Sequence, residues 1–235
     1  HNGSHSFIDH TGTGHLIING STSNNVDIMK AGHSEYMARF KPDGAVELYH
    51  NNFKSFETHA NGITVIGPEG GGGILRLYGD EGDDNADKWD LNANTNGTLL
   101  VRNYASGSWE NSIIATGNGN VELYYNNSKK IETTDTGVRI PDSQKYEVGA
   151  GADMLLFHNG TNNYIRSDNG TLYIDSSGGE QMVTAVPNGA VELYYDDSKK
   201  FETYAGGVKP HGHVNIQAGH LYLADSYKAN FGNSD

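Results

Sequence analysis

Near its middle, the chain reads Gly119-Asn120-Val121-Glu122-Leu123-Tyr124-Tyr125-Asn126-Asn127-Ser128-Lys129-Lys130-Ile131-Glu132-Thr133. Two further stretches, 44–58 and 189–203, align with this one without gaps, and the three copies are spaced 75 and 70 residues apart. Each copy continues to a glycine followed by Ile or Val. Agreement over this length in three places identifies a repeat protein.

The repeat predicts a β-hairpin. In the stretch 121–125, alternate side chains point to opposite faces, so that Val121 and Leu123 share one face while Glu122 lies on the other. The turn falls at Asn126-Asn127, because Asn and Asp tolerate the left-handed backbone conformation of tight turns. The strand pairing can run within one chain or between chains.

The length of the hairpin loop determines which residues face each other. A two-residue loop would place Leu123 opposite Lys130 and mix the two faces. A three-residue loop, 126–128, keeps one face apolar and is the register we expect. It predicts three pairs in the middle copy: Leu123 with Ile131, Tyr124 with Lys130, and Glu122 with Glu132.

Shorter repeats overlap the hairpin repeat. The start of the chain, 1–18, resembles 158–174, and 142–149 resembles 225–232. The repeats divide the chain into five parts: a first repeat (1–66), an inserted β module with an acidic loop (67–116), a second repeat (117–157), a third repeat (158–224) and the start of a further repeat (225–235). Both ends fall inside a recurring unit, so we expect the parent protein to continue in both directions.

The composition agrees with many short strands joined by tight turns. Of 235 residues, 31 are glycine and 25 asparagine, and hydrophobic residues make up 35%, below the ~45–50% of ordinary globular domains. Charged residues make up only 19%, so the chain does not have the charge-rich composition of a disordered protein. The low apolar content favours a thin object with a narrow core.

Charge and cysteine content exclude several classes of function. The net charge of −13 argues against a nucleic-acid-binding surface, which rests on Lys and Arg. The absence of cysteine excludes disulfides, zinc fingers and thiol catalysis. No stretch approaches ~18 consecutive apolar residues, so we expect no membrane insertion.

Two architectures satisfy these observations, because an isolated hairpin is marginally stable and must pack on other repeats or other chains. One is a single-chain parallel β-solenoid. The other is a homotrimeric fibre whose chains intertwine about a threefold axis. Solenoid coils run to ~20–30 residues, whereas the units here are 70 and 75 residues long. We therefore expect an all-β, elongated, repetitive fibre, a homotrimeric intertwined β-helix or β-prism with hairpin modules.

The hairpin repeat, together with the Gly-Val that follows it, resembles repeats in tail-fibre proteins of tailed bacteriophages, especially marine and cyanobacterial ones. Other elements of the chain are similar to repeats of the same family: His158-Asn159-Gly160-Thr161 with Tyr164-Ile165, and Leu77-Tyr78-Gly79-Asp80-Glu81-Gly82-Asp83-Asp84-Asn85-Ala86-Asp87-Lys88-Trp89 with Asn103-Tyr104-Ala105-Ser106-Gly107-Ser108-Trp109. The resemblance implies an extracellular, virion-attached, trimeric fibre for adsorption to bacteria.

The resemblance also implies partners: two further copies of the chain, other virion tail proteins, and a host glycan or protein receptor reached through a distal tip. Neither a tip nor a self-cleaving chaperone domain is evident, so the segment is expected to be shaft. Two other readings stay open. One is a tailspike-like β-solenoid with glycan-binding or depolymerase activity, and the other is a bacterial extracellular adhesin or filament subunit.

No motif for catalysis is present: there is no Gly-x-Ser-x-Gly, no P-loop and no His-Glu-x-x-His. A carboxylate pair could cleave glycans, but Glu47, Glu57 and their repeats are expected on outward hairpin faces, in structural roles. We therefore expect a protein that is not an enzyme and that has no organic cofactor.

His211-Gly212-His213 is the sharpest metal candidate. In a strand, residues two apart point the same way, so three copies of His211 and His213 around a threefold axis would offer six imidazoles to one octahedral transition metal such as iron. Such His-x-His sites occur in some phage fibres and spikes, so the resemblance supports the prediction. The alternative is a pair of exposed histidines in a turn after Pro210.

The acidic stretch 80–87 offers oxygen ligands for calcium. Its Asp83-x-Asn85-x-Asp87 spacing is similar to a calcium loop, but Lys88 stands where the EF-hand glycine belongs. A solvated acidic turn is therefore the favoured interpretation. Trp89 and Trp109 could form a glycan platform, yet both are expected to pack in a core.

Overall fold

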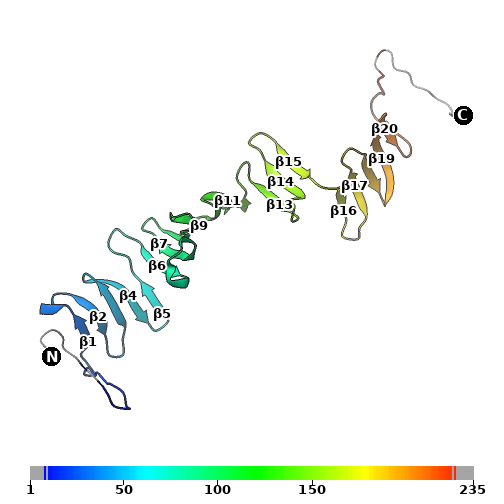
Figure 1. Ribbon diagram of the computed structural model, residues 1–235. Coiled ribbons are helices and arrows are strands. Elements are labelled where there is room, and N and C mark those ends of the chain that lie inside the picture. Colours follow the sequence, from blue (N-terminus) through cyan, green and yellow to red (C-terminus); the bar gives the residue numbers. More distant parts are fainter. Residues whose placement is uncertain (1–7, 9, 224, 226–235) are drawn as a thin grey trace. The chain divides into compact units, whose positions relative to one another are not determined.

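The computed structural model describes residues 8, 10–223 and 225, and it is all-β as predicted (Figure 1). Within the described part, the strands form four antiparallel sheets, and short 3₁₀ turns at Ala31–His33, Asp80–Gly82 and Asn85–Asp87 are the helical elements. That part holds no helix with the length and apolarity needed to cross a bilayer. The chain divides into two units, His1–Pro141 and Asp142–Asp235, which are described separately.

The first unit contains two sheets. The five-stranded sheet consists of β1 (Val26–Met29), β2 (Tyr36–Phe40), β3 (Val46–His50), β4 (Phe53–His59) and β5 (Gly62–Val65). The seven-stranded sheet consists of β6 (Gly73–Tyr78), β7 (Lys88–Ala93), β8 (Thr98–Asn103), β9 (Glu110–Thr116), β10 (Val121–Tyr125), β11 (Ser128–Thr133) and β12 (Val138–Arg139). The second sheet spans residues on both sides of position 116, where the sequence repeats suggested a boundary.

The second unit also contains two sheets. The three-stranded sheet consists of β13 (Lys145–Val148), β14 (Met154–His158) and β15 (Asn163–Ser167). The five-stranded sheet consists of β16 (Leu172–Asp175), β17 (Gln181–Ala185), β18 (Val191–Tyr195), β19 (Ser198–Tyr204) and β20 (Gly207–Pro210).

Every sheet is a meander in which each strand pairs with its neighbours in the sequence. All strand pairs of the described residues are antiparallel. A parallel solenoid would instead need crossover connections between like-directed strands. The single-chain parallel β-solenoid is therefore wrong for this part of the chain, and the repeat hairpins pair within the chain.

The three repeat hairpins, β3–β4, β10–β11 and β18–β19, share one register. Leu123 pairs with Ile131, and Glu122 pairs with Glu132, as predicted. The equivalent pairs recur in the other two hairpins: Leu48 with Phe56, Glu47 with Glu57, Leu193 with Phe201, and Glu192 with Glu202. One hairpin geometry is therefore built three times.

The predicted loop of three residues is wrong, because the register shifts at a β-bulge beyond Leu123. Tyr124 lies opposite Lys129 instead of Lys130, which leaves Lys130 as the extra residue of the bulge. The turn has two residues, Asn126 and Asn127, with φ of 47° and 55°. Positive φ at both positions defines the tight hairpin turn that Asn favours.

The structural repeat is larger than the hairpin. The strand sets β1–β5, β8–β12 and β16–β20 have the same order, and we call each of them a five-strand module. The same two side-chain bonds hold each module together. One joins a threonine hydroxyl to the amide at the start of the hairpin, at 2.9 Å in all three modules: Thr58 to Val46, Thr133 to Val121, and Thr203 to Val191.

The second recurring bond is made by the turn. The side-chain oxygen of its second residue accepts a hydrogen bond from a backbone amide of the preceding strand pair. The distances are 2.8, 2.9 and 3.0 Å: Asn52 from Tyr36, Asn127 from Asn111, and Asp197 from Gln181. Since Asn111 lies in β9, the last part of the 67–116 stretch belongs to the second module.

Candidate functional site

Each module presents one apolar face, and this surface is repeated in all three modules. The strand registers align apolar side chains in a row across each sheet, which we call the central apolar row. Its members are Ile28, Ala38, Leu48, Phe56 and Val65 in the first module; Leu75, Leu91, Val101, Ile113, Leu123 and Ile131 in the seven-stranded sheet; and Ile174, Val183, Leu193, Phe201 and Pro210 in the third module. A second row beside it includes Val46, Val121 and Val191.

The large side chains of these rows are exposed or half-buried. The equivalent leucines Leu48, Leu123 and Leu193 are 45%, 44% and 43% exposed. Among the described residues, the buried apolar side chains are Leu155, which is 1% exposed, and Ala38, a small member of the central apolar row, which is 8% exposed. Each module of a single chain therefore leaves most of its apolar face uncovered. Exposed apolar faces of this kind mark protein interaction surfaces.

The opposite face of each module is polar and much better covered. Glu47 is 2% exposed, and its carboxylate accepts bonds from Lys41 (2.8 Å), Lys54 (3.2 Å) and the hydroxyl of Tyr49 (2.7 Å). Lys54 also pairs with Glu57. Within one chain these glutamates are the covered side chains and the leucines are the exposed ones. The outward position of the glutamates in an assembly stays a prediction.

The same arrangement occurs in all three modules, and we call it the Glu–Lys–Tyr cluster. Its lysine bridges two cross-strand glutamates and its tyrosine donates to the first of them. The members are Glu47, Glu57, Lys54 and Tyr49; Glu122, Glu132, Lys129 and Tyr124; and Glu192, Glu202, Lys199 and Tyr194. The cluster resolves the like-charge pairing that the register creates.

The cluster sets the protonation of its members. The hydrogen bond from Lys41, against the opposing effect of burial, lowers the pKa of Glu47 to about 2. The hydrogen bond from Tyr124 lowers the pKa of Glu122, and the one from Lys129 lowers the pKa of Glu132. Burial, followed by the bond to Glu122, raises the pKa of Tyr124 to about 12.

The lowered pKa values of the cluster glutamates bear on the hypothesis that the chain is a depolymerase. Glycosidic cleavage by a carboxylate pair needs one member with a raised pKa that serves as the general acid. In the Glu–Lys–Tyr cluster both carboxyl groups have lowered pKa values, so both stay ionised near neutral pH. The cluster therefore suits a structural ion network and not acid catalysis. The repeated lysine keeps a constant spacing from both glutamates in the sequence, and this spacing is the signal from which the cluster can be predicted.

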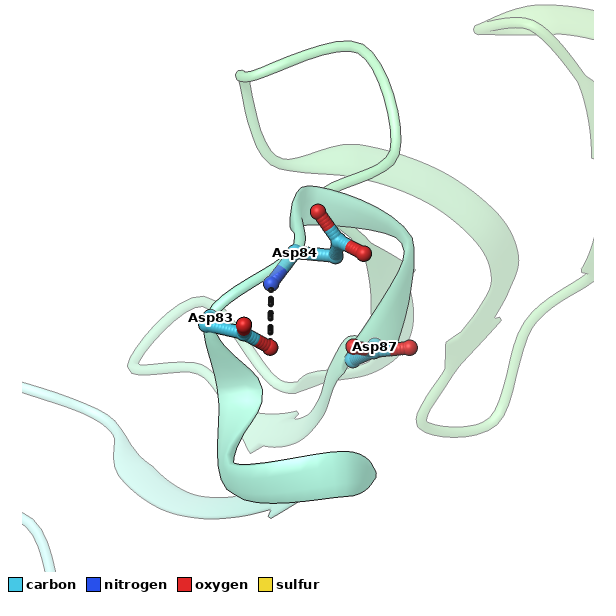
Figure 2. Close-up of side chains that lie close together, drawn as sticks. All are labelled: Asp83, Asp84 and Asp87. Carbon is cyan, nitrogen blue, oxygen red and sulfur yellow. Dashed lines mark hydrogen bonds between the residues drawn. The ribbon is translucent and has the colours of Figure 1, made fainter.

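The acidic stretch 80–87 brings three carboxylates together at the turn that joins β6 to β7. Figure 2 shows Asp83, Asp84 and Asp87, whose nearest oxygens lie within 4.8 Å of one another. One Asp83 oxygen accepts a hydrogen bond from the amide of Asp84 (3.1 Å). This geometry agrees with a solvated acidic turn.

The predicted metal ligands His211 and His213 follow β20. The Nε2 atom of His211 lies 3.1 Å from Glu202 Oε1, and its amide donates to Lys200 (2.9 Å). His211 therefore lies on the polar face, with the third Glu–Lys–Tyr cluster, while His213 is exposed. The metal site stays a prediction, and the position of His211 opposite the apolar row does not fit a metal on an axis lined by that row.

The two tryptophans lie on opposite faces of the seven-stranded sheet. Trp89 pairs with Leu77 on the apolar face and is 43% exposed, so the expectation that it packs in a core is wrong within this chain. Trp109 lies on the polar face, with its ring centre 5.2 Å from that of Tyr104. The two residues therefore cannot form one platform.

Comparison with known proteins gives no family. No family model and no curated protein matches the chain. A crystal structure of BBS1N in complex with ARL6DN, soaked with mercury, aligns with 74% of this chain and 64% of its own chain, at 12% identity and a TM-score of 0.16. This chain thus spans less than two thirds of that one, and the likeness is too low to carry an argument.

Proposed function

We propose that this chain is a shaft segment of a bacteriophage tail fibre, in which three copies pack their apolar faces about a common axis. The shaft is a structural element of the extracellular virion. It connects other tail proteins to a distal tip that binds a glycan or protein receptor on the bacterial host. The observation that carries the proposal is the exposed apolar row at equivalent positions of all three modules.

The energetics favour a covered apolar face. Fully burying a leucine contributes about 1.5–3 kcal/mol. Leu48, Leu123 and Leu193 are still 45%, 44% and 43% exposed in a single chain. Covering the exposed part of each leucine therefore contributes on the order of 1 kcal/mol. Every module adds other residues of its row. A long fibre therefore gains stability with each module, without a large core in any single chain.

The polar faces suit the outer surface of such a fibre. Their cross-strand glutamates are already paired with lysine, and each inner strand hydrogen-bonds to both of its neighbours within the meander. Packing apolar faces inward gives a β-prism of three flat sheets, in place of strands that intertwine between chains. The threefold symmetry comes from the resemblance to tail fibres; the inward-facing surface comes from the exposed row.

The mass of the purified chain tests the proposal. Sedimentation equilibrium at micromolar concentration is expected to give three times 25.4 kDa. A monomer at that concentration would contradict the shaft. An open-ended series of polymers would instead favour the filament-subunit reading, because a closed trimer leaves no free apolar face.

A second measurement separates the shaft from a depolymerase. Incubation of the trimer with purified capsule or lipopolysaccharide is expected to leave the polymer length unchanged. Release of oligosaccharides would support the tailspike depolymerase and contradict the proposal that the shaft is not an enzyme.

A further inference from the structure

The polar face of the seven-stranded sheet has an open pocket of about 250 Å³. Its lining comes from three places in the chain: Arg76 and Tyr78 on β6, Lys88 on β7, and Tyr104 and Trp109 on the β8–β9 connection. Two cations and three aromatic rings thus converge on one hollow. Neither the hairpin repeat nor the Glu–Lys–Tyr cluster contributes to it.

Cation–π contacts surround the Tyr104 and Trp109 rings of the pocket. The rings of Tyr104 and Trp109 are tilted by 58° at 5.2 Å between centres. The guanidinium of Arg102 lies 5.3 Å from the Trp109 ring centre, and that of Arg76 lies 5.8 Å from it. Lys88 Nζ lies 5.8 Å from the Tyr104 ring. Such contacts fix the orientation of the rings.

The cations of the pocket differ in how they are neutralised. Arg102 makes a two-pronged contact with the buried Asp90, at 2.9 and 2.6 Å. Among the described residues, no carboxylate comes within 4.0 Å of Arg76 or Lys88. Two uncompensated positive charges therefore face the pocket of a protein whose net charge is −13.

The surroundings limit the kind of anion that can enter. The acidic stretch 80–87 connects β6 to β7 and so lies next to the pocket. Its carboxylates repel a densely charged polyanion such as a nucleic acid, which carries a charge at every nucleotide and would extend over them. A small ligand with one negative charge avoids this repulsion. The volume, below the 300 Å³ at which drug-sized pockets begin, suits a single ring.

We propose that this pocket binds an acidic sugar residue, a pyranose ring with a carboxylate, within a bacterial surface polysaccharide. The planar guanidinium of Arg76 suits the carboxylate, which it can contact through two parallel hydrogen bonds, and Lys88 supplies a second positive charge. The Trp109 and Tyr104 rings offer apolar faces to the C–H side of the sugar, with polar edges for its hydroxyls.

The binding of an acidic sugar does not depend on the trimer, while the bacterial source of that sugar rests on the proposed function. The pocket lies on the polar face, opposite Trp89 and the central apolar row, so covering the apolar face leaves it open. A shaft with such sites would contact host glycan along its length, in addition to any contact made by a tip. Failure of sugar binding would leave the trimer mass unaffected, and a monomeric mass would leave the sugar site standing.

Tryptophan fluorescence provides the test, because the two tryptophans lie on opposite faces. The Trp89→Phe variant keeps Trp109 as its one tryptophan. Titration with methyl β-glucuronide is expected to change its fluorescence with saturation in the millimolar range, as for a single small ligand. Methyl β-glucoside, which lacks only the carboxylate, is expected to bind at least tenfold more weakly. In the Trp109→Phe variant the remaining tryptophan is Trp89, on the opposite face, and the same titration is expected to leave its fluorescence unchanged.

Charge variants supply the control, with binding measured by calorimetry. Arg76→Gln and Lys88→Gln are each expected to weaken glucuronide binding about fivefold or more. Lys145→Gln is the matched control, because Lys145 Nζ lies 5.7 Å from the Phe157 ring in another sheet, and it is expected to bind as the parent does. Three results would overturn the proposal: no saturable signal, equal affinity for glucoside, or equal affinity for inorganic phosphate.

Discussion

Glu47 shows how this chain treats charge at the scale of single residues. A carboxylate that is 2% exposed normally costs free energy, yet here two lysines and a tyrosine hydroxyl surround it. On this face of the sheet, the ion pairs and hydrogen bonds of the cluster take the place of apolar packing. The opposite face then keeps its leucines and valines available for other contacts.

Replacing Glu47 with glutamine is expected to lower the free energy of unfolding by about 1–2 kcal/mol at pH 7. This is less than the 3–5 kcal/mol of a wholly buried pair, because Lys41 and Lys54 are 39% and 33% exposed and remain partly solvated. Urea unfolding at fixed protein concentration measures the change. Glu69→Gln, at an exposed position outside the sheets, is the control and is expected to change nothing.

The pH dependence of the same variant follows from the direction of the shift. The pKa of Glu47 is lowered from its ordinary value of 4.5 to about 2 in the folded protein. Its contribution is therefore complete above about pH 5 and is lost as the pH falls through 4.5 toward 2. The stability difference between the parent protein and Glu47→Gln should shrink over that range. A difference that stays constant down to pH 2 would argue against the ionised cluster.

The threonine of each module makes a second testable contact. Thr133 accepts the amide hydrogen of Val121 at 2.9 Å, and Thr133→Val keeps the shape while removing the acceptor. We expect a loss of about 1 kcal/mol, the usual effect of deleting one partner of such a bond. Thr95→Val, at an exposed turn position, is the matched control. Equal urea midpoints for both variants would show that the bond contributes nothing.

At this scale the sequence predicts which residues share a face but not which face is covered. Alternation correctly separates Leu123 from Glu122. Within one chain the glutamate face is the covered one, because Lys129 and Tyr124 reach over the glutamates, whereas the leucines have no such neighbours. Long amphipathic side chains can cover a sheet as well as apolar ones do.

Elements are the scale at which the sequence analysis succeeds best. The apolar and Glu–Glu cross-strand pairs follow from the requirement for one apolar face, and the structure confirms them. The bulge at Leu123/Tyr124 follows from neither loop length, because each loop length predicts one uniform register along the whole hairpin. A register that changes within the hairpin satisfies both the apolar pairing and the preference of Asn126-Asn127 for a two-residue turn.

The turn allows a prediction that uses the third module as its reference. Asn127 accepts a hydrogen bond from the Asn111 amide, and Asp197 makes the equivalent bond at 3.0 Å. Asn127→Asp is therefore expected to retain stability, because the acceptor oxygen is kept. Asn127→Gly suits the positive φ of 55° but loses the acceptor, so we expect it to lower the stability by about 1 kcal/mol. Thermal melting of both variants checks this; a glycine variant as stable as the aspartate variant would contradict it.

At the scale of the whole molecule, the central apolar row is expected to control assembly. Leu123→Glu places a charge where three chains are proposed to meet, and burying an unpaired carboxylate is strongly unfavourable. We expect the trimer to dissociate to monomers at micromolar concentration while the circular dichroism of each chain stays that of a β protein. Sedimentation velocity measures the outcome.

The control for this experiment is the same substitution outside the sheets. Leu221→Glu changes a leucine that is 70% exposed and follows the last strand, and it is expected to leave the mass unchanged. If Leu123→Glu also leaves the mass unchanged, the central apolar row does not lie between the chains.

The meander order of the strands has a consequence for how such a chain is made and how it changes over time. Since each strand pairs only with sequence neighbours in its own sheet, the contact order is low, and folding does not wait for distant segments. A module can complete its hydrogen bonds soon after its last strand leaves the ribosome. Duplication or loss of a module by recombination leaves the pairing of every other module intact, so length is a property that selection can adjust in whole-module steps.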